Sequence, residues 1–425
     1  MGSNPMGTVS PLILCLYVMP IFWTNLSLDS YALPKLTAAA FLAFLASLGK
    51  RIPKTPLDGF FIACGVTLLL STLFSSNPAV SALGHYRIHT FSLIPCCIVA
   101  GLFYVSLASE DGADTYENFA KHIVYAAVIS SAWALMQLGG LYMPYPLSDG
   151  RPYAGFGSTI YLAAFLAIAV PLALERRMFW QAASIVLGIV LTETRAGLIA
   201  AAAGSGWWWF STQRPSWRHV FTIAAGLLLA GSIMVAWRTD LKKADAGRVI
   251  LYKTALRIFK NNPLFGHGPD TFLQAFLTYR DKSWEAAGFS RSSAQGTVHN
   301  DILQSLACGG IFWTLAYLAL CIGLGAAFFI FEKHGVLGSG LALFTYAKLN
   351  ETPFAVKAIF FILAGSALRE VISARNDGHW LRVALGIIAA GYAVIFIFDR
   401  LLYWGAVLGS NGLFNQAHFV MRVFS

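Results

Sequence analysis

Charged residues are scarce in this chain, and their scarcity excludes a soluble protein. Only 12% of its 425 residues are charged and 57% are apolar, whereas about a quarter of the residues in soluble domains are charged. A soluble protein of this composition has too little polar surface to stay monomeric. The 12 Trp, 16 Tyr and 32 Phe exclude intrinsic disorder. The composition therefore predicts an all-α, polytopic membrane protein.

Cysteine pairs and cofactor motifs are also lacking. The six cysteines form no C-x-x-C pair, which argues against a disulfide scaffold or a structural zinc site. No Walker motif or dinucleotide fingerprint occurs, so direct use of ATP is not expected. The loops placed outside below contain no Asp-x-Asp pair for a divalent cation. We therefore expect neither a metal nor another cofactor, and we do not read the net charge of +10 as a sign of nucleic-acid binding.

Long apolar runs are abundant instead. A membrane-spanning helix needs roughly 20 mostly apolar residues, which predicts about twelve spans. The candidate runs are 9–28, 31–49, 57–75, 90–108, 119–141, 157–174, 178–193, 195–210, 219–237, 301–331, 336–350, 355–372 and 381–398. We expect an N-terminal membrane bundle over 1–237, a large loop over 238–299 and C-terminal membrane helices over 300–425.

The distribution of Lys and Arg predicts the orientation of the spans. With the N-terminus in the cytoplasm, the basic loop containing Lys50, Arg51 and Lys54 is inside, and residues 238–299 are outside. That outer loop holds ten of the thirty Lys and Arg residues and only five carboxylates. Residues 249–259 alternate apolar and basic side chains, which predicts an amphipathic helix at the membrane surface. Membrane lipids are therefore expected partners.

Four polar features are candidates for chemistry, and each has a plainer interpretation. Arg195 joins two apolar runs at the outer side, where its guanidinium suits phosphate oxygens or merely marks the membrane surface. Arg248 lies on the predicted loop helix among cations that solvent or lipid can satisfy. His267 stands in the glycine turn 266–268, which is typical of a structural turn.

The fourth feature is the segment His299-Asn300-Asp301, which closes the basic loop and opens the next apolar run. Nearby cations disfavour the imidazolium, so a neutral imidazole that can act as a base is expected at neutral pH. The plainer interpretation is a helix start, because Asn and Asp are preferred helix N-caps.

Four blocks in order carry a family resemblance: residues 151–157 (RPYAGFG), 192–197 (TETRAG), 262–268 (NPLFGHG) and 299–304 (HNDILQ). Together they resemble the O-antigen ligase and O-antigen polymerase superfamily of bacterial inner-membrane glycan transferases. The chain length and the number of expected spans look most like the O-antigen ligase.

The resemblance implies a GT-C-like fold and a metal-independent, inverting glycosyl transfer in the inner membrane, with the active site facing the periplasm. The donor it implies is an O-antigen polysaccharide on undecaprenyl diphosphate, and the acceptor is the lipid A-core oligosaccharide. It implies that His299 is the general base and that Arg195 and Arg248 bind the diphosphate. Further candidates for supporting roles are Arg151, His267, Asn300 and Asp301.

Two other functions remain open from the sequence. An O-antigen polymerase would use the same lipid-linked glycan as donor and as acceptor. A membrane transporter or flippase is favoured by one feature, the break at 350–353 (NETP) within an apolar stretch, since broken helices with charges are common in transporters.

Overall fold

The structure is a computed structural model of the chain. It describes residues 10–24, 30–85, 89–109, 115–141, 150–212, 241–281, 283–290, 293–369, 375–376, 385–397 and 399–400. Helices dominate the described residues, which confirms the all-α prediction. One antiparallel strand pair accompanies them, in which β1 (Ile52–Pro53) lies beside β2 (Arg375–Asn376).

The helices of the first half of the chain follow the predicted apolar runs closely. They are α1 (Pro11–Ile21), α2 (Ala32–Ser47), α3 (Asp58–Leu73), α4 (Pro78–Leu83), α5 (Leu93–Leu107), α6 (Tyr116–Leu138), the 3-10 turn η2 (Ala154–Phe156), α7 (Thr159–Glu175), α8 (Phe179–Leu191) and α9 (Arg195–Thr212). The short helix α4 and the turn η2 were not predicted. The predicted run 219–237 lies outside the described residues.

The second half begins with the helices of the predicted loop. These are α11 (Leu241–Asn261), α12 (Phe272–Tyr279) and α13 (Ser283–Ala286), followed by α14 (Asp301–Ile330), α15 (His334–Leu349), α16 (Phe354–Leu368) and a helix over Leu385–Ile397. Helix α11 contains the predicted amphipathic segment 249–259 and ends two residues after it, at Asn261.

Two of the described helices, α6 and α14, are both long enough and apolar enough to cross a membrane. Most of the other described helices of the bundle are apolar but shorter, at 10–17 residues. The predicted number of about twelve spans and the GT-C-like class therefore stay predictions.

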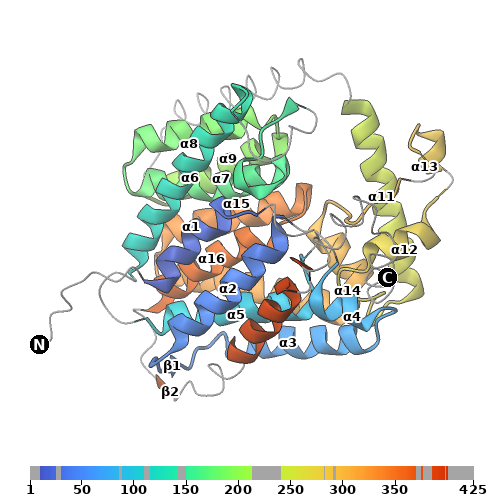
Figure 1. Cartoon of the computed structure of the whole chain (residues 1–425), viewed down its shortest axis with the longest axis horizontal. Coiled ribbons are helices and arrows are strands. Elements are labelled where there is room, and N and C mark those ends of the chain that lie inside the picture. Colours follow the sequence, from blue (N-terminus) through green and yellow to red (C-terminus); the bar gives the residue numbers. More distant parts are fainter. Residues whose placement is uncertain are drawn as a thin grey trace, which may run out of the picture.

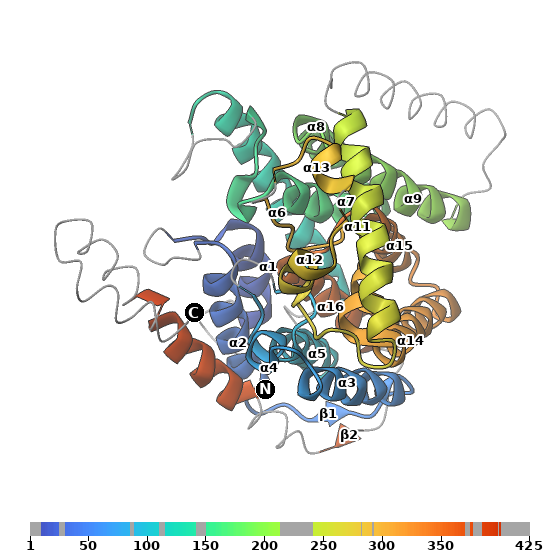
Figure 2. The same ribbon diagram turned by 90° about the vertical axis from the view of Figure 1, so that its right-hand side faces the viewer.

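The loop helices gather on one side of the molecule. Figure 1 shows α11, α12 and α13 together at the right, while the β1–β2 pair lies at the lower left. Figure 2 looks onto that side, and the three helices lie in front of the bundle. They share a small apolar core of their own, in which Ile258 of α11, Phe276 of α12 and Trp284 of α13 are buried. The face of α11 that carries Val249 and Leu256 is exposed, as expected of an amphipathic helix.

Close helix packing sets one end of the bundle. Gly197 of α9 packs on Ala163 of α7, and Gly204 packs on Pro171, so the two helices run parallel. Helix α15 runs antiparallel to α7, because Ser339 Oγ donates to Ile168 O at 2.8 Å while Tyr346 OH donates to Ile160 O. The first residues of α7 and α9 and the last residues of α15 consequently lie at the same end.

Helix α14 is sharply bent at Gly310, whose φ is +74°. The amide of Ile311 donates to Pro263 O at 2.9 Å instead of continuing the helix. Residues 263–268, which we call the clasp, fill the bend: His267 N donates to Ala307 O at 3.0 Å and Gly268 N to Cys308 O at 2.8 Å. A Cβ on Gly310 would lie 2.3 Å from Leu264 O, so only glycine permits this approach. The clasp thus satisfies backbone groups that the bend leaves without helical partners.

Candidate functional site

The candidate site begins at the N-terminal end of α14. Asn300 caps the helix, with its Oδ1 accepting from Ile302 N at 3.0 Å and Leu303 N at 3.1 Å. On the other side of His299, Val298 N donates to Gln304 Oε1 at 2.8 Å. His299 itself has a φ of +58°, a left-handed conformation that is uncommon for a residue with a side chain. Such strain is found most often at functional sites.

The ring of His299 is half-buried, and its Nδ1 is fully covered without a hydrogen-bond partner among the described residues. Burial lowers the pKa of His299 below its ordinary value. The Arg248 guanidinium lowers this pKa further, and the Glu351 carboxylate raises it. The expected neutral imidazole is therefore supported, although burial rather than neighbouring cations is its main cause.

Arg248 reaches the site from α11. The residue is half-buried, and its Nη2 donates to Asn350 Oδ1 at 3.3 Å. Because Arg248 and His299 also interact electrostatically, the structure brings together two of the three residues expected to act. The Arg248 guanidinium of the predicted basic loop therefore lies near the start of α14.

The connection between α15 and α16 forms the opposite wall of the site. Asn350, Glu351 and Thr352 are buried, with exposed fractions of 2%, 8% and 1%. Glu351 Oε1 accepts from Tyr161 OH of α7 at 2.5 Å, while Glu351 Oε2 is buried without a hydrogen-bond partner in the described structure. Sequence reasoning did not assign Glu351 to the site. The signal was present, because a carboxylate in a break between two apolar runs is costly unless it has a function.

Asn300 and Asp301 tie this wall to α14. Asn300 Nδ2 donates to Lys348 O at 3.0 Å. Asp301 is buried and accepts from the hydroxyl of Thr352, and its Oδ2 lies 3.7 Å from Lys357 Nζ. Both side chains thus hold the connection in place beside His299.

Arg195 is the first residue of α9 and is half-buried. The parallel packing of α9 on α7 places it at the same end of the bundle as Tyr161. Arg151 is also half-buried and stands directly before the buried turn 152–156. That turn packs against the first helices of the chain, where Lys35 Nζ donates to Gly155 O at 2.6 Å.

His267 lies in the clasp. Its Nδ1 is 2.9 Å from Ser76 Oγ and 2.9 Å from Thr271 Oγ1, and burial lowers its pKa. The neighbouring Asp270 is buried and accepts from the backbone amides of residues 90–92, with N···O distances of 2.9–3.2 Å. Burial nevertheless raises the pKa of Asp270. These contacts give His267 a structural place, in agreement with the plainer interpretation of the glycine turn.

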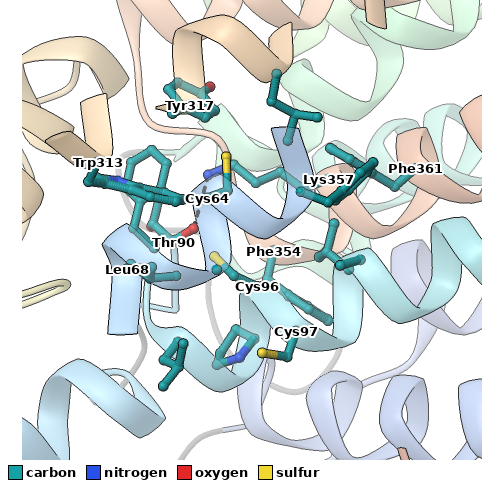
Figure 3. Close-up of a pocket in the computed structure, with 18 residues that line it drawn as sticks. Cys64, Leu68, Thr90, Cys96, Cys97, Trp313, Tyr317, Phe354, Lys357 and Phe361 are labelled. Atoms are coloured by element: carbon teal, nitrogen blue, oxygen red, sulfur yellow. Dashed lines mark hydrogen bonds between the residues drawn. The ribbon is translucent and has the colours of Figure 1, made fainter. Parts of the chain in front are cut away.

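An apolar cavity lies next to the site, between α3, α5, α14 and α16. Figure 3 shows Lys357 in its wall, with the amine pointing toward Thr90, whose carbonyl oxygen accepts from Lys357 Nζ at 3.0 Å. A second apolar cavity lies between α14, α15 and α16. Lys357 and Tyr317 line both cavities. Both apolar cavities therefore extend to Lys357, the residue that forms an ion pair with Asp301.

The described side chains contain no group of three His, Cys, Asp or Glu residues placed to hold a metal ion. Positive charge gathers at the site instead: Arg248 and Lys357 are joined by Lys348, whose Nζ is buried over the Phe344 ring at 4.3 Å from its centre. Fixed cations of this kind suit an anionic ligand such as a phosphate.

The fold and the site define a helical membrane protein with a cationic, histidine-containing site at one end of its bundle. Residues 180–318 match the family model described as O-antigen ligase. The match runs from α8 into α14 and includes Arg195, Arg248 and His299. The match covers about a third of the chain and supports an assignment to the O-antigen ligase/polymerase family of glycosyltransferase-type enzymes. Together with the apolar helices, it suggests a bacterial inner-membrane protein. No curated protein matches the chain.

Proposed function

We propose that this protein is an O-antigen ligase, which transfers O-antigen polysaccharide from undecaprenyl diphosphate to the lipid A-core oligosaccharide. The observation that carries the proposal is the electrostatic interaction of Arg248 with the half-buried His299 at the start of α14, where burial lowers the pKa of His299 and favours its neutral form. The family description supports the reaction class, since it covers both ligases and polymerases.

His299 acts as the general base in this proposal. Its imidazole takes the proton of the acceptor hydroxyl while the acceptor oxygen attacks the anomeric carbon of the donor. The bond from that carbon to the phosphate oxygen breaks, and the lipid diphosphate leaves with the electron pair. General base catalysis contributes about 10²–10⁴ in rate. A neutral imidazole is the form that this step requires, and burial favours it.

Arg195 and Arg248 stabilise the leaving diphosphate. Negative charge grows on the leaving group, and fixed guanidinium groups stabilise it without a metal ion. The loss of one such contact costs about 10²–10³ in rate.

Two features support a lipid-linked donor presented at the periplasmic side. The apolar cavities beside Lys357 offer space for a hydrocarbon chain close to the site. The loop helices lie away from β1, which is flanked by the basic residues predicted to be cytoplasmic (Figure 1). The domain division at 237/238 and 299/300 is part of the same proposal, and its first boundary lies outside the described residues.

A transfer assay in liposomes tests the proposal. The purified protein receives undecaprenyl diphosphate-linked glycan and lipid A-core in the presence of EDTA. We expect ligated product from the wild type and a loss of about 10²–10⁴ in rate from His299→Ala. His122→Ala is the matched control, because His122 lies on α6 and its Nδ1 is 2.8 Å from Tyr17 OH.

The outcomes separate the candidate functions. Extension of the lipid-linked glycan without ligation would assign a polymerase. If the wild type and His299→Ala transferred glycan equally fast, His299 would have only a structural role at the start of α14. The proposed general-base mechanism would then be wrong. The break at 350–353 no longer favours a transporter, because its side chains line the candidate site.

A further inference from the structure

Glu351 and His299 meet in the site although 52 positions separate them in the chain. The contacts on either side draw their backbones together. Asn300 Nδ2 donates to Lys348 O at 3.0 Å, and the Thr352 hydroxyl donates to the Asp301 carboxylate. Glu351 and His299 each lie between residues that take part in these contacts.

Each of the two side chains has one buried polar atom without a hydrogen-bond partner among the described residues. In His299 it is Nδ1, and in Glu351 it is Oε2. The other carboxylate oxygen of Glu351 is already held by Tyr161 OH at 2.5 Å. The two atoms are not hydrogen-bonded to each other in the structure, but their residues interact electrostatically. A protonated Nδ1 is a donor and Oε2 is an acceptor, so a small movement of either side chain would let each atom satisfy the other. Buried polar atoms without partners are rare in native proteins and need an explanation.

We propose that Glu351 is a positioning residue for His299: it accepts a hydrogen bond from Nδ1–H and thereby leaves Nε2 as the nitrogen that faces the acceptor hydroxyl. This inference rests on the proposed role of His299 as general base. When Nε2 takes the substrate proton, the carboxylate stabilises the imidazolium, and both protons stay on the histidine. Tyr161 orients Glu351 from α7 in turn.

The groups around the pair define what each variant changes. Glu351 and Arg248 act on His299 from the α15–α16 connection and from α11. Tyr161 of α7 and Tyr346 of α15 are the groups that interact with Glu351. Removal of the carboxylate charge leaves Arg248 and burial unopposed, and both disfavour the imidazolium. The pKa of His299 therefore falls when Glu351 loses its charge.

The first experiment titrates His299 without reference to activity. Mass-spectrometric exchange of the histidine C2 proton in lipid nanodiscs gives its titration midpoint. In Glu351→Gln we expect the midpoint to move down by about one pH unit, and in Glu351→Asp we expect it to stay near the wild type. Glu285→Gln, the same change at an exposed position of α13, is the matched control. An unchanged midpoint in Glu351→Gln overturns the proposal.

Kinetics give the second measurement. Glu351→Gln should lower kcat by about 10²–10⁴, as expected when the partner that orients a catalytic histidine is lost, with the KM for the donor unchanged. The acid limb of its pH profile should move down with the midpoint, and Glu351→Asp should recover part of the rate. If Glu351→Gln instead raised the KM for the donor and left the acid limb of the pH profile in place, Glu351 would act on Arg248 rather than on His299. That result would overturn the proposal.

A measurement on the wild type covers the case in which Glu351→Gln fails to fold. Nitrogen NMR of ¹⁵N-histidine-labelled protein, assigned with His299→Gln, should show the Nδ1–H tautomer at pH 8, whereas an Nε2–H tautomer overturns the proposal. The proposed ligase function and the proposed Glu351–His299 hydrogen bond can fail separately. If the titration midpoint of His299 shifts in Glu351→Gln but the wild type transfers no glycan, the hydrogen bond stands and the function is wrong. If the wild type transfers glycan but the midpoint does not shift, the function stands and the hydrogen bond is wrong.

Discussion

Two histidines lie in turns beside α14, and their surroundings differ. His267 belongs to the clasp, where its Nδ1 is within hydrogen-bond distance of two hydroxyl groups and its backbone amide binds Ala307 O. His299 stands at the helix start with a strained backbone and a covered Nδ1 that has no partner among the described residues. Burial lowers the pKa of both. A lowered pKa therefore does not distinguish the two histidines, whereas the hydrogen bonds of their Nδ1 atoms do.

The largest effect expected to sharpen this comparison is a loss of transfer rate when the candidate site around His299 is changed. Arg248→Lys replaces a planar guanidinium by a single ammonium, which cannot bind a diphosphate in two places. We expect a loss of about 10²–10³ in transfer rate with folding unchanged. Arg257→Lys on the same helix is the control, because Arg257 is exposed and pairs only with Asp281 among the ion pairs that the structure describes. Equal activity of the two variants would contradict the role of Arg248.

A change at the clasp should lower the stability of the protein rather than its activity. Gly310→Ala places a Cβ 2.3 Å from Leu264 O in a left-handed backbone conformation, which costs about 1–3 kcal/mol of strain before any clash is counted. We expect a lower melting temperature in detergent. Gly325→Ala lies on the same helix, where an added Cβ meets no atom within 4 Å, and it should be neutral or stabilising by about 0.5–1 kcal/mol. A melting temperature for Gly310→Ala at or above that of the wild type would show that the clasp does not need glycine.

His267→Ala tests the comparison directly. The substitution removes the side-chain hydrogen bonds of the clasp and should lower the free energy of unfolding by about 1–2 kcal/mol. Because His267 is not in the proposed chemistry, kcat per folded molecule should stay close to that of the wild type. Thermal unfolding and the liposome assay measure the two quantities. A loss of kcat as large as that of His299→Ala would place both histidines in the reaction.

The smallest expected effect is the position of the acid limb of kcat/KM. A general base must be neutral, and burial lowers the pKa of His299 below 6.5. Activity should accordingly persist as the pH falls to 6.5 and decline only below that value. The pH profile of the wild type measures this directly, and a midpoint above 6.5 would mean that the Glu351 carboxylate outweighs burial and Arg248.

Several parts of the fold could be predicted because they depend on neighbouring residues. Apolar runs and caps are local signals, so both ends of α9, α14 and α15 and the C-terminal end of α11 were predicted within about two residues. The start of α11 at Leu241 lies before the predicted segment 249–259. The bend in α14 was not predicted, although the adjacent Gly309 and Gly310 in the run 301–331 are a local signal for a helix break. Its cause is the clasp, which approaches from about 40 residues earlier in the chain.

By itself, the sequence determined that this protein is largely helical and has membrane-protein character, and it predicted a basic loop that carries Arg248 and ends in His299. Composition, periodicity and helix capping are properties of short segments, and they suffice for those conclusions. Only the tertiary structure brought Glu351 and Tyr161 to the candidate site and gave His267 hydrogen-bond partners in the clasp. Burial and hydrogen-bond partners arise from contacts between helices far apart in the chain, and no local pattern specifies which buried polar atom will meet which other.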